Sequence, residues 1–151
     1  METALPTLLK FKNHASPEIA ETCQIAIDLI NWKKSGENIS RGQYLSHDPA
    51  PPLTDSKNIS DLQRTLMDSS QSLFVRYRAM FSLRNMNSDE AALALVKGFE
   101  DESALFRHEV AYVLGQMQRP ITSAALIEVL KKKDEHRMVR HEAAEVRFNV
   151  V

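Results

Sequence analysis

The sequence has little cysteine and little glycine, and it has no long apolar run. The single cysteine, Cys23, excludes an internal disulfide framework and is typical of a reducing compartment. No apolar stretch approaches the ~18 residues that a membrane-spanning helix needs, and the first residues contain no signal-peptide hydrophobic region. These features predict a soluble, cytoplasmic protein.

The sequence also lacks a charge excess and the residue pattern of a β-sheet. The 151 residues carry a formal net charge of −1, which argues against a basic surface for nucleic acid or anionic membranes. Four glycines and the shortage of alternating β-branched runs argue against strands. Because Ala, Leu, Glu, Lys, Met and Arg dominate the periodic segments, we predict an all-α protein.

One short pattern recurs along the chain at nearly constant spacing. Residues 75–79, 106–110 and 139–143 align at intervals of 31 and 33 residues, and residues 19–23 form a looser earlier copy. Each copy follows another amphipathic stretch, and polar breaks separate the two. Paired helices at a period in the low thirties predict an α-solenoid, in which each helical hairpin packs on the next.

The repeat copies and the composition between them also predict the domain organisation. A stretch rich in Ser, Gly, Asp and Pro separates the earliest copy from the other three, which is typical of a linker. The predicted segments are a first repeat at residues 1–34, a linker at 35–58, further repeats at 59–145 and a divergent tail at 146–151.

Two of the copies carry the same Arg-His-Glu sequence, which contains His108-Glu109 and His141-Glu142. At about 100° per residue, His108 and His141 fall nearly opposite the apolar stripes of their helices. A single pair there indicates an ordinary solvated helix face. Two pairs in register, on helices packed about 8–10 Å apart, place imidazoles and carboxylates where they can meet at a metal. Such ligands suit iron, manganese or zinc.

These segments resemble the deoxyhypusine hydroxylase family, which consists of oxygenases built from HEAT-like repeats. Residues 103–116 resemble the family's catalytic repeat, and residues 138–145 resemble the following repeat. The sequence Tyr-Leu-Ser-His-Asp-Pro-Ala-Pro-Pro at residues 44–52 is similar to the linker between the family's two halves. The similarity extends from about residue 5 to residue 145.

The resemblance implies an iron-dependent monooxygenase, an oxidoreductase of hypusine biosynthesis. Such an enzyme uses O2 to hydroxylate the deoxyhypusine side chain of translation initiation factor five-A, at a di-iron centre between two pseudo-symmetric halves. Matched residue by residue, His108, His141 and Glu142 are expected to be iron ligands. Glu109 belongs either to the metal set or to the binding of the substrate's amine. We favour the amine, because a carboxylate is the natural partner of a protonated amine.

The chain departs from the family's pattern in two ways. It has two His-Glu pairs where the family has four, and Arg147 stands at the core position that Leu114 holds in the preceding copy. We therefore expect a fragment or a truncated form, whose last residues do not belong to the fold.

Three hypotheses about function follow from these departures. In the first, two chains rebuild a di-iron hydroxylase as a homodimer, since twofold symmetry presents the same face on both partners. Alternatively, the chain is a half-solenoid that binds a protein without metal. A repeat protein of the bilin-lyase type is the third hypothesis, against which the paired Arg-His-Glu copies and the linker argue.

Overall fold

The structure is a computed structural model that describes residues 2–37, 44, 46–54 and 58–149. These residues form eight α-helices and three 3-10 helices, with no strand among them, which confirms the all-α prediction. None of the helices in these ranges is long and apolar enough to span a membrane. The elements are η1 (Glu2–Ala4), α1 (Leu5–Phe11), α2 (Pro17–Lys34), α3 (Ile59–Met67), α4 (Leu73–Met86), α5 (Asp89–Val96), η2 (Lys97–Glu100), α6 (Ala104–Met117), η3 (Pro120–Thr122), α7 (Ser123–Lys131) and α8 (Arg137–Asn149).

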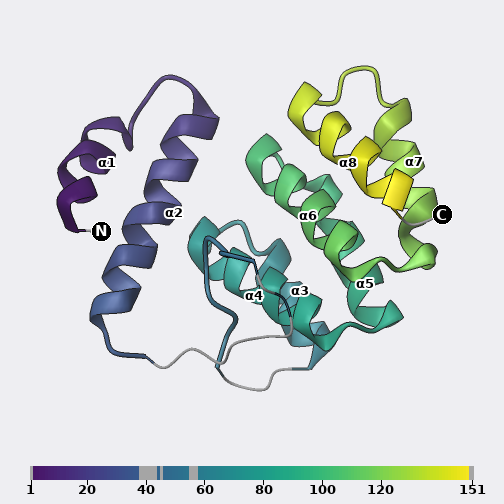
Figure 1. Cartoon of the computed structure of the whole chain (residues 1–151), viewed down its shortest axis with the longest axis horizontal. Helices are drawn as coiled ribbons and strands as arrows, with labels where there is room; N and C mark the ends of the chain where they lie inside the picture. The colour runs from purple at the N-terminus through teal and green to yellow at the C-terminus, as the bar shows by residue number, and fades with distance from the viewer. Residues whose placement is uncertain (1, 38–43, 45, 55–57, 150–151) are drawn as a thin grey trace.

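The helices form four successive hairpins, each made of a first and a second helix (Figure 1). The second helices α2, α4, α6 and α8 follow one another around an arc, with α4 packed on α6 and α6 packed on α8. The hairpin of α1 and α2 lies across from α6 and α8 in Figure 1, and α2 contacts both α4 and α6. This arrangement confirms the predicted α-solenoid.

Capping side chains start four of the helices, and one of them, Ser103, lies in a polar break that the sequence predicted. At α3, α4, α5 and α6, a side-chain oxygen accepts a hydrogen bond from the backbone N–H three residues later, which satisfies a donor that the helix itself leaves free. The capping residues are Asn58, Ser72, Ser88 and Ser103. Both α4 and α6 end at a residue in the left-handed conformation, Asn87 with φ 48° and Gln118 with φ 49°. The repeat therefore recurs in its helix ends as well as in its core.

The core lies between successive hairpins and includes two buried charge pairs. The apolar stripe predicted for α6 is buried, and the ring of Phe106 stacks on that of Tyr77 with their centroids 5.7 Å apart. Arg76 of α4 pairs with Asp101 in the loop before α6. One repeat later, Arg107 of α6 pairs with Glu135 in the loop before α8, at 2.6 Å. These pairs join α4 and α6 to the loop of the hairpin that follows each of them.

The end of α8 differs from the predicted boundary at residue 146. The helix continues to Asn149, because Val146 is 4% exposed and packs against the backbone of α6 at Gly115. The side chain of Arg147, and residues 150–151 as a whole, lie outside the described part of the chain.

Candidate metal centre

The close packing of α6 on α8 brings one residue from each His-Glu pair together. His108 Nε2 lies 3.3 Å from a carboxylate oxygen of Glu142, across the contact between the two helices. The approach is close because Gly115 has no side chain, and a Cβ there would lie 2.6 Å from Val146 Cγ2. The pair is half-buried, with 27% of the His108 side chain and 15% of the Glu142 side chain exposed.

The environment of His108 favours its charged form. The hydrogen bond that the imidazole donates to the Glu142 carboxylate raises the pKa of His108, and burial opposes that effect without cancelling it. The other ring nitrogen, Nδ1, is buried and has no hydrogen-bond partner among the described residues. The imidazole therefore presents Nε2 to the carboxylate of Glu142, and a metal ion at this position would replace the proton between them.

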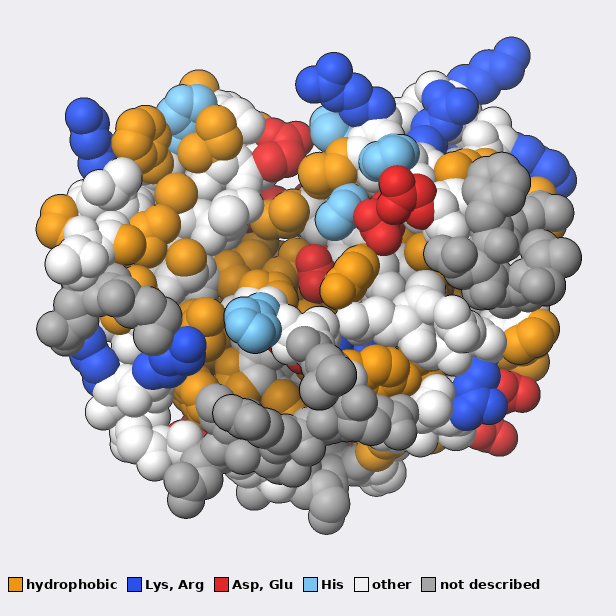
Figure 2. All heavy atoms as spheres, viewed as in Figure 1, with side chains coloured by type: hydrophobic (Ala, Val, Ile, Leu, Met, Phe, Trp, Pro, Cys, Tyr) orange, Lys and Arg blue, Asp and Glu red, His pale blue; other side chains and the backbone are white. Residues whose placement is uncertain are grey.

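Glu109 lines a cavity between α2, α4 and α6. Burial raises the pKa of Glu109 to about 7, while the nearby charge of His108 lowers it. The cavity has a volume of about 250 Å³ and is lined by Thr22, Ile25, Ala26, Leu29, Pro49, Tyr77, Leu105 and Glu109. Figure 2 shows hydrophobic side chains within the hollow beside α2, and acidic and histidine side chains over α6 and α8. Glu109 is thus an acid on a mostly apolar wall.

His141 is more exposed than His108 and contacts a different acid. Its side chain is 72% exposed, and its Nε2 lies 3.1 Å from Glu145, one turn further along α8. Successive residues of a helix point about 100° apart, so Glu142 contacts His108 of α6 while the neighbouring His141 contacts Glu145. The same geometry separates His108 from Glu109 on α6. Of the four residues predicted to meet at a metal, the structure brings together His108 and Glu142.

The described part of the chain supplies a partial ligand set. Within it, no three His, Cys, Asp or Glu side chains come together as a group that could hold a metal ion. Imidazole and carboxylate are the right donors for a mid-row divalent metal, but such ions take four to six ligands. The pair of His108 and Glu142 therefore fits an iron site only if further donors come from elsewhere.

Sequence reasoning missed several residues that shape this region. Tyr112 and Gln116 follow His108 at successive intervals of four, so they share its helix face, and Gln116 Nε2 donates to the Tyr112 hydroxyl at 3.1 Å. The buried Arg84 of α4 joins Gln116 to Asp48 in the linker. The spacing of four was a usable signal for Tyr112 and Gln116. No local signal connected Asp48 to this helix face.

Comparisons with known proteins support the resemblance drawn from the motifs. The family of HEAT repeats matches residues 62–146. Deoxyhypusine hydroxylase of Drosophila melanogaster is 49% identical over 142 residues, which are 93% of this chain and 47% of that protein. The human enzyme is 46% identical over 142 residues, with the same two shares. The chain spans about half the length of the curated relatives it matches.

A solved structure agrees over nearly the whole chain. The structure of human deoxyhypusine hydroxylase in complex with glycerol superposes with a TM-score of 0.94 at 44% sequence identity. The match covers 99% of this chain and 52% of the human one. The predicted resemblance to deoxyhypusine hydroxylase is confirmed.

Proposed function

Since the chain belongs to the family of HEAT-repeat proteins and matches half of deoxyhypusine hydroxylase, we propose that it carries half of that enzyme's di-iron site. The activity is the O2-dependent hydroxylation of the deoxyhypusine side chain of translation initiation factor five-A. The observation that carries the proposal is the contact of His108 Nε2 with Glu142 at 3.3 Å, between helices whose motifs match the family's catalytic repeats.

The ligand roles follow from the donor chemistry of each side chain. His108, Glu142 and His141 hold iron, and donors from a second half complete the coordination. When bound, the iron supplies the activation of O2. His108 must lose a proton to bind a cation, and Glu142 raises the pKa of this imidazole, so iron retention weakens as the pH falls.

Glu109 has a different role, which is to bind the amine of the substrate. Its carboxylate lies on the wall of the cavity of about 250 Å³, where the other lining side chains are mostly apolar. An ammonium group can pair with this carboxylate while its methylene chain lies against the apolar wall. The mostly apolar lining lowers the local dielectric constant, which strengthens the attraction between the two charges.

The second half of the site comes from another copy of the chain in this proposal. Two chains related by a twofold axis present the same face to each other and bring together two His108–Glu142 pairs. The protein partner of this assembly is the deoxyhypusine-bearing initiation factor five-A.

The first test is the amount of iron retained per chain. The protein is loaded anaerobically with ferrous iron, passed through size exclusion, and assayed for iron in each peak. We expect about one iron per chain in a dimer-sized peak, since carboxylate–histidine helical sites hold metal pairs. His108→Ala, His141→Ala and Glu142→Ala should each remove the iron with little loss of helix by circular dichroism.

The control for this test is His14→Ala, which removes a histidine outside the repeat register and should leave iron retention unchanged. An iron-free wild-type peak at every protein concentration contradicts the proposal for this chain. That outcome favours the alternative of a half-solenoid that binds a protein without metal.

A further inference from the structure

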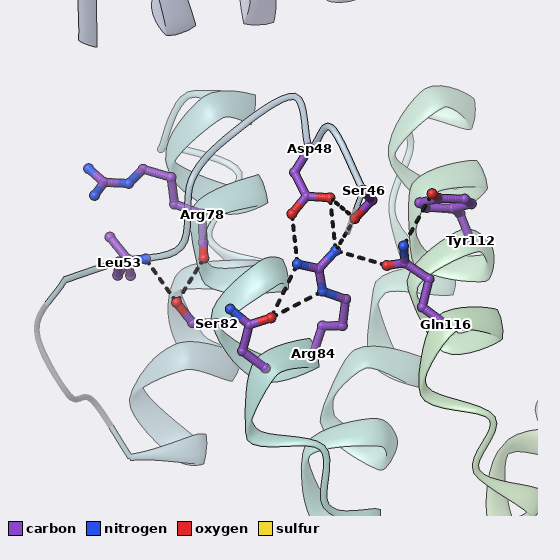
Figure 3. A network of polar contacts seen from close by, with 9 residues as sticks. Ser46, Asp48, Leu53, Arg78, Ser82, Arg84, Tyr112 and Gln116 are labelled. Atoms are coloured by element: carbon purple, nitrogen blue, oxygen red, sulfur yellow. Dashed lines mark hydrogen bonds and ion pairs between the residues drawn. The ribbon is translucent and has the colours of Figure 1, made fainter. Parts of the chain in front are cut away.

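The described part of the linker includes a strap, residues 46–53, that is fastened along α4 (Figure 3). Arg84 holds one end of it: the guanidinium donates to the two oxygens of Asp48 at 2.9 and 2.7 Å and to the Ser46 hydroxyl at 3.2 Å. The same guanidinium donates to the Gln116 side chain of α6 at 2.8 Å. Arg84 is 1% exposed, so this network is inside the protein and connects the strap with two helices.

A second set of contacts holds the other end of the strap. Arg78, which precedes Arg84 on α4, donates to the carbonyls of Pro51 at 3.3 Å and Pro52 at 3.2 Å. The Ser82 hydroxyl oxygen accepts a hydrogen bond from the Leu53 backbone N–H at 2.9 Å. Fastened at both ends, the strap has a fixed path where it passes α4.

The fixed path brings Pro49 to the wall of the Glu109 cavity. Pro49 follows Asp48 directly and lines the cavity together with side chains of α2, α4 and α6. Ala50, the next residue, is fully buried, so the strap is packed against the helices at this point. Because Asp48 is held by Arg84, the position of this wall depends on a contact that lies outside the cavity.

The cavity leaves one polar group without a hydrogen bond. The Thr22 hydroxyl donates to the Glu18 carbonyl at 2.7 Å, and the Tyr77 hydroxyl donates to the Leu105 carbonyl at 3.3 Å. The carboxylate of Glu109 receives no hydrogen bond from any described residue. A ligand for this cavity therefore combines a cationic donor with an apolar body.

We propose that Arg84 is a positioning residue, which acts through Asp48 to hold Pro49 as the cavity wall that fits an unbranched aliphatic ammonium ion beside Glu109. The inference rests on the proposed function for the identity of the substrate, whose side chain is an unbranched amine. The inference adds that the strap, through Pro49, makes the cavity fit a straight aliphatic chain better than a branched one. If the wall moves, the cavity widens, admits water and no longer distinguishes a straight chain from a branched one.

Two isomeric probes test this selection directly. n-Pentylammonium and neopentylammonium have the same charge and the same number of carbons, so a difference in their affinities reports cavity shape. Binding is followed by NMR chemical shifts of the isotope-labelled chain without any metal. We expect the wild-type chain to prefer the straight isomer by roughly fivefold or more, since single methyl groups are worth such factors in a shaped pocket.

Variants separate positioning from general stability. Asp48→Ala should bring the preference below about twofold, while Asp48→Asn, which keeps one acceptor for Arg84, should restore most of it. Glu109→Gln should remove the binding of both isomers because it removes the carboxylate. The matched control is Glu135→Gln, which weakens the buried pair with Arg107 and lines no part of the cavity, so the preference should stay.

Three outcomes overturn the inference: no binding of the straight isomer by the wild-type chain, equal affinities for the two isomers, or an unchanged preference in Asp48→Ala. The measurement uses no iron, so a failure of the chain to retain iron leaves it intact. Conversely, iron retention without shape preference contradicts this inference alone.

Discussion

On α6, His108 is half-buried against Glu142 and Glu109 lies in a cavity, whereas on α8 the same tripeptide has His141 72% exposed beside Glu145. The two segments differ in what is packed around them. In the described structure α6 lies between α4 and α8 and contacts α2, while α8 is packed on α6 and α7. A repeated motif thus has chemistry that depends on its neighbours, and the predictions below test this difference.

The largest expected effect comes from separating the two helices. Gly115→Ala places a Cβ 2.6 Å from Val146 Cγ2, so we expect a loss of about 1–3 kcal/mol in the free energy of unfolding. Urea denaturation measures this loss. The double variant Gly115→Ala/Val146→Ala should lose less stability than the sum of the losses in the two single variants. The smaller side chain at position 146 leaves room for the added methyl group.

Helix propensity alone predicts the opposite sign for this substitution. Alanine in a helix interior is favoured over glycine by up to about 1 kcal/mol. A Gly115→Ala chain that is more stable than the wild type would therefore show that α6 and α8 do not approach as closely as the structure indicates.

A second, smaller effect concerns the buried acid of α6. The pKa of Glu109 is raised by burial to about 7, above its ordinary value of 4.5, so the folded state favours the protonated form. The stability from this group is full below pH 4.5 and is lost as the pH rises through 7. We expect Glu109→Gln to stabilise the chain by roughly 1–3 kcal/mol at pH 8 and to give little gain at pH 4.5.

The matched control is the acid at the same position of the other copy. Glu109 is a buried acid that lacks a hydrogen bond, whereas Glu142 is the charged partner of His108. Glu142→Gln should therefore bring no gain in the free energy of unfolding at pH 8. Urea denaturation of both variants at the two pH values makes the comparison. Equal responses of the two variants would show that the acids have the same environment.

The smallest effect distinguishes the two histidines. Glu142 raises the pKa of His108 above its ordinary value of 6.5, so the pair stabilises the fold fully below pH 6.5 and loses that contribution as the pH rises through the raised pKa. We expect His108→Gln to cost up to about 1 kcal/mol more at pH 5.5 than at pH 8.

His141→Gln provides the comparison for that measurement. Its pair with Glu145 is solvent-exposed, and exposed pairs contribute about 0–1 kcal/mol at most, so the substitution should cost little at either pH. If the stability cost of His141→Gln depended more on pH than that of His108→Gln, His141 and not His108 would be the histidine with the stronger acidic partner.

Several structural features could be predicted because they depend on local periodicity. The apolar stripe through Phe106, Val110 and Val113 is buried as predicted, and the polar break before α6 carries the cap that starts this helix. The divergent tail at residues 146–151 stays a prediction, although α8 continues to Asn149 and Val146 packs on Gly115, which lies far away in the sequence. That contact has no signature in the residues beside Val146.

By itself the sequence determined the all-α solenoid, its repeat spacing and the resemblance to deoxyhypusine hydroxylase, because helix periodicity and motif identity are local properties. The tertiary structure decided which residues of the two Arg-His-Glu segments meet. It paired His108 with Glu142, left His141 exposed and placed Glu109 on the wall of a cavity. It also fastened Asp48 of the linker to Arg84. These outcomes depend on helix packing and on contacts between distant parts of the chain, which no short segment of sequence encodes.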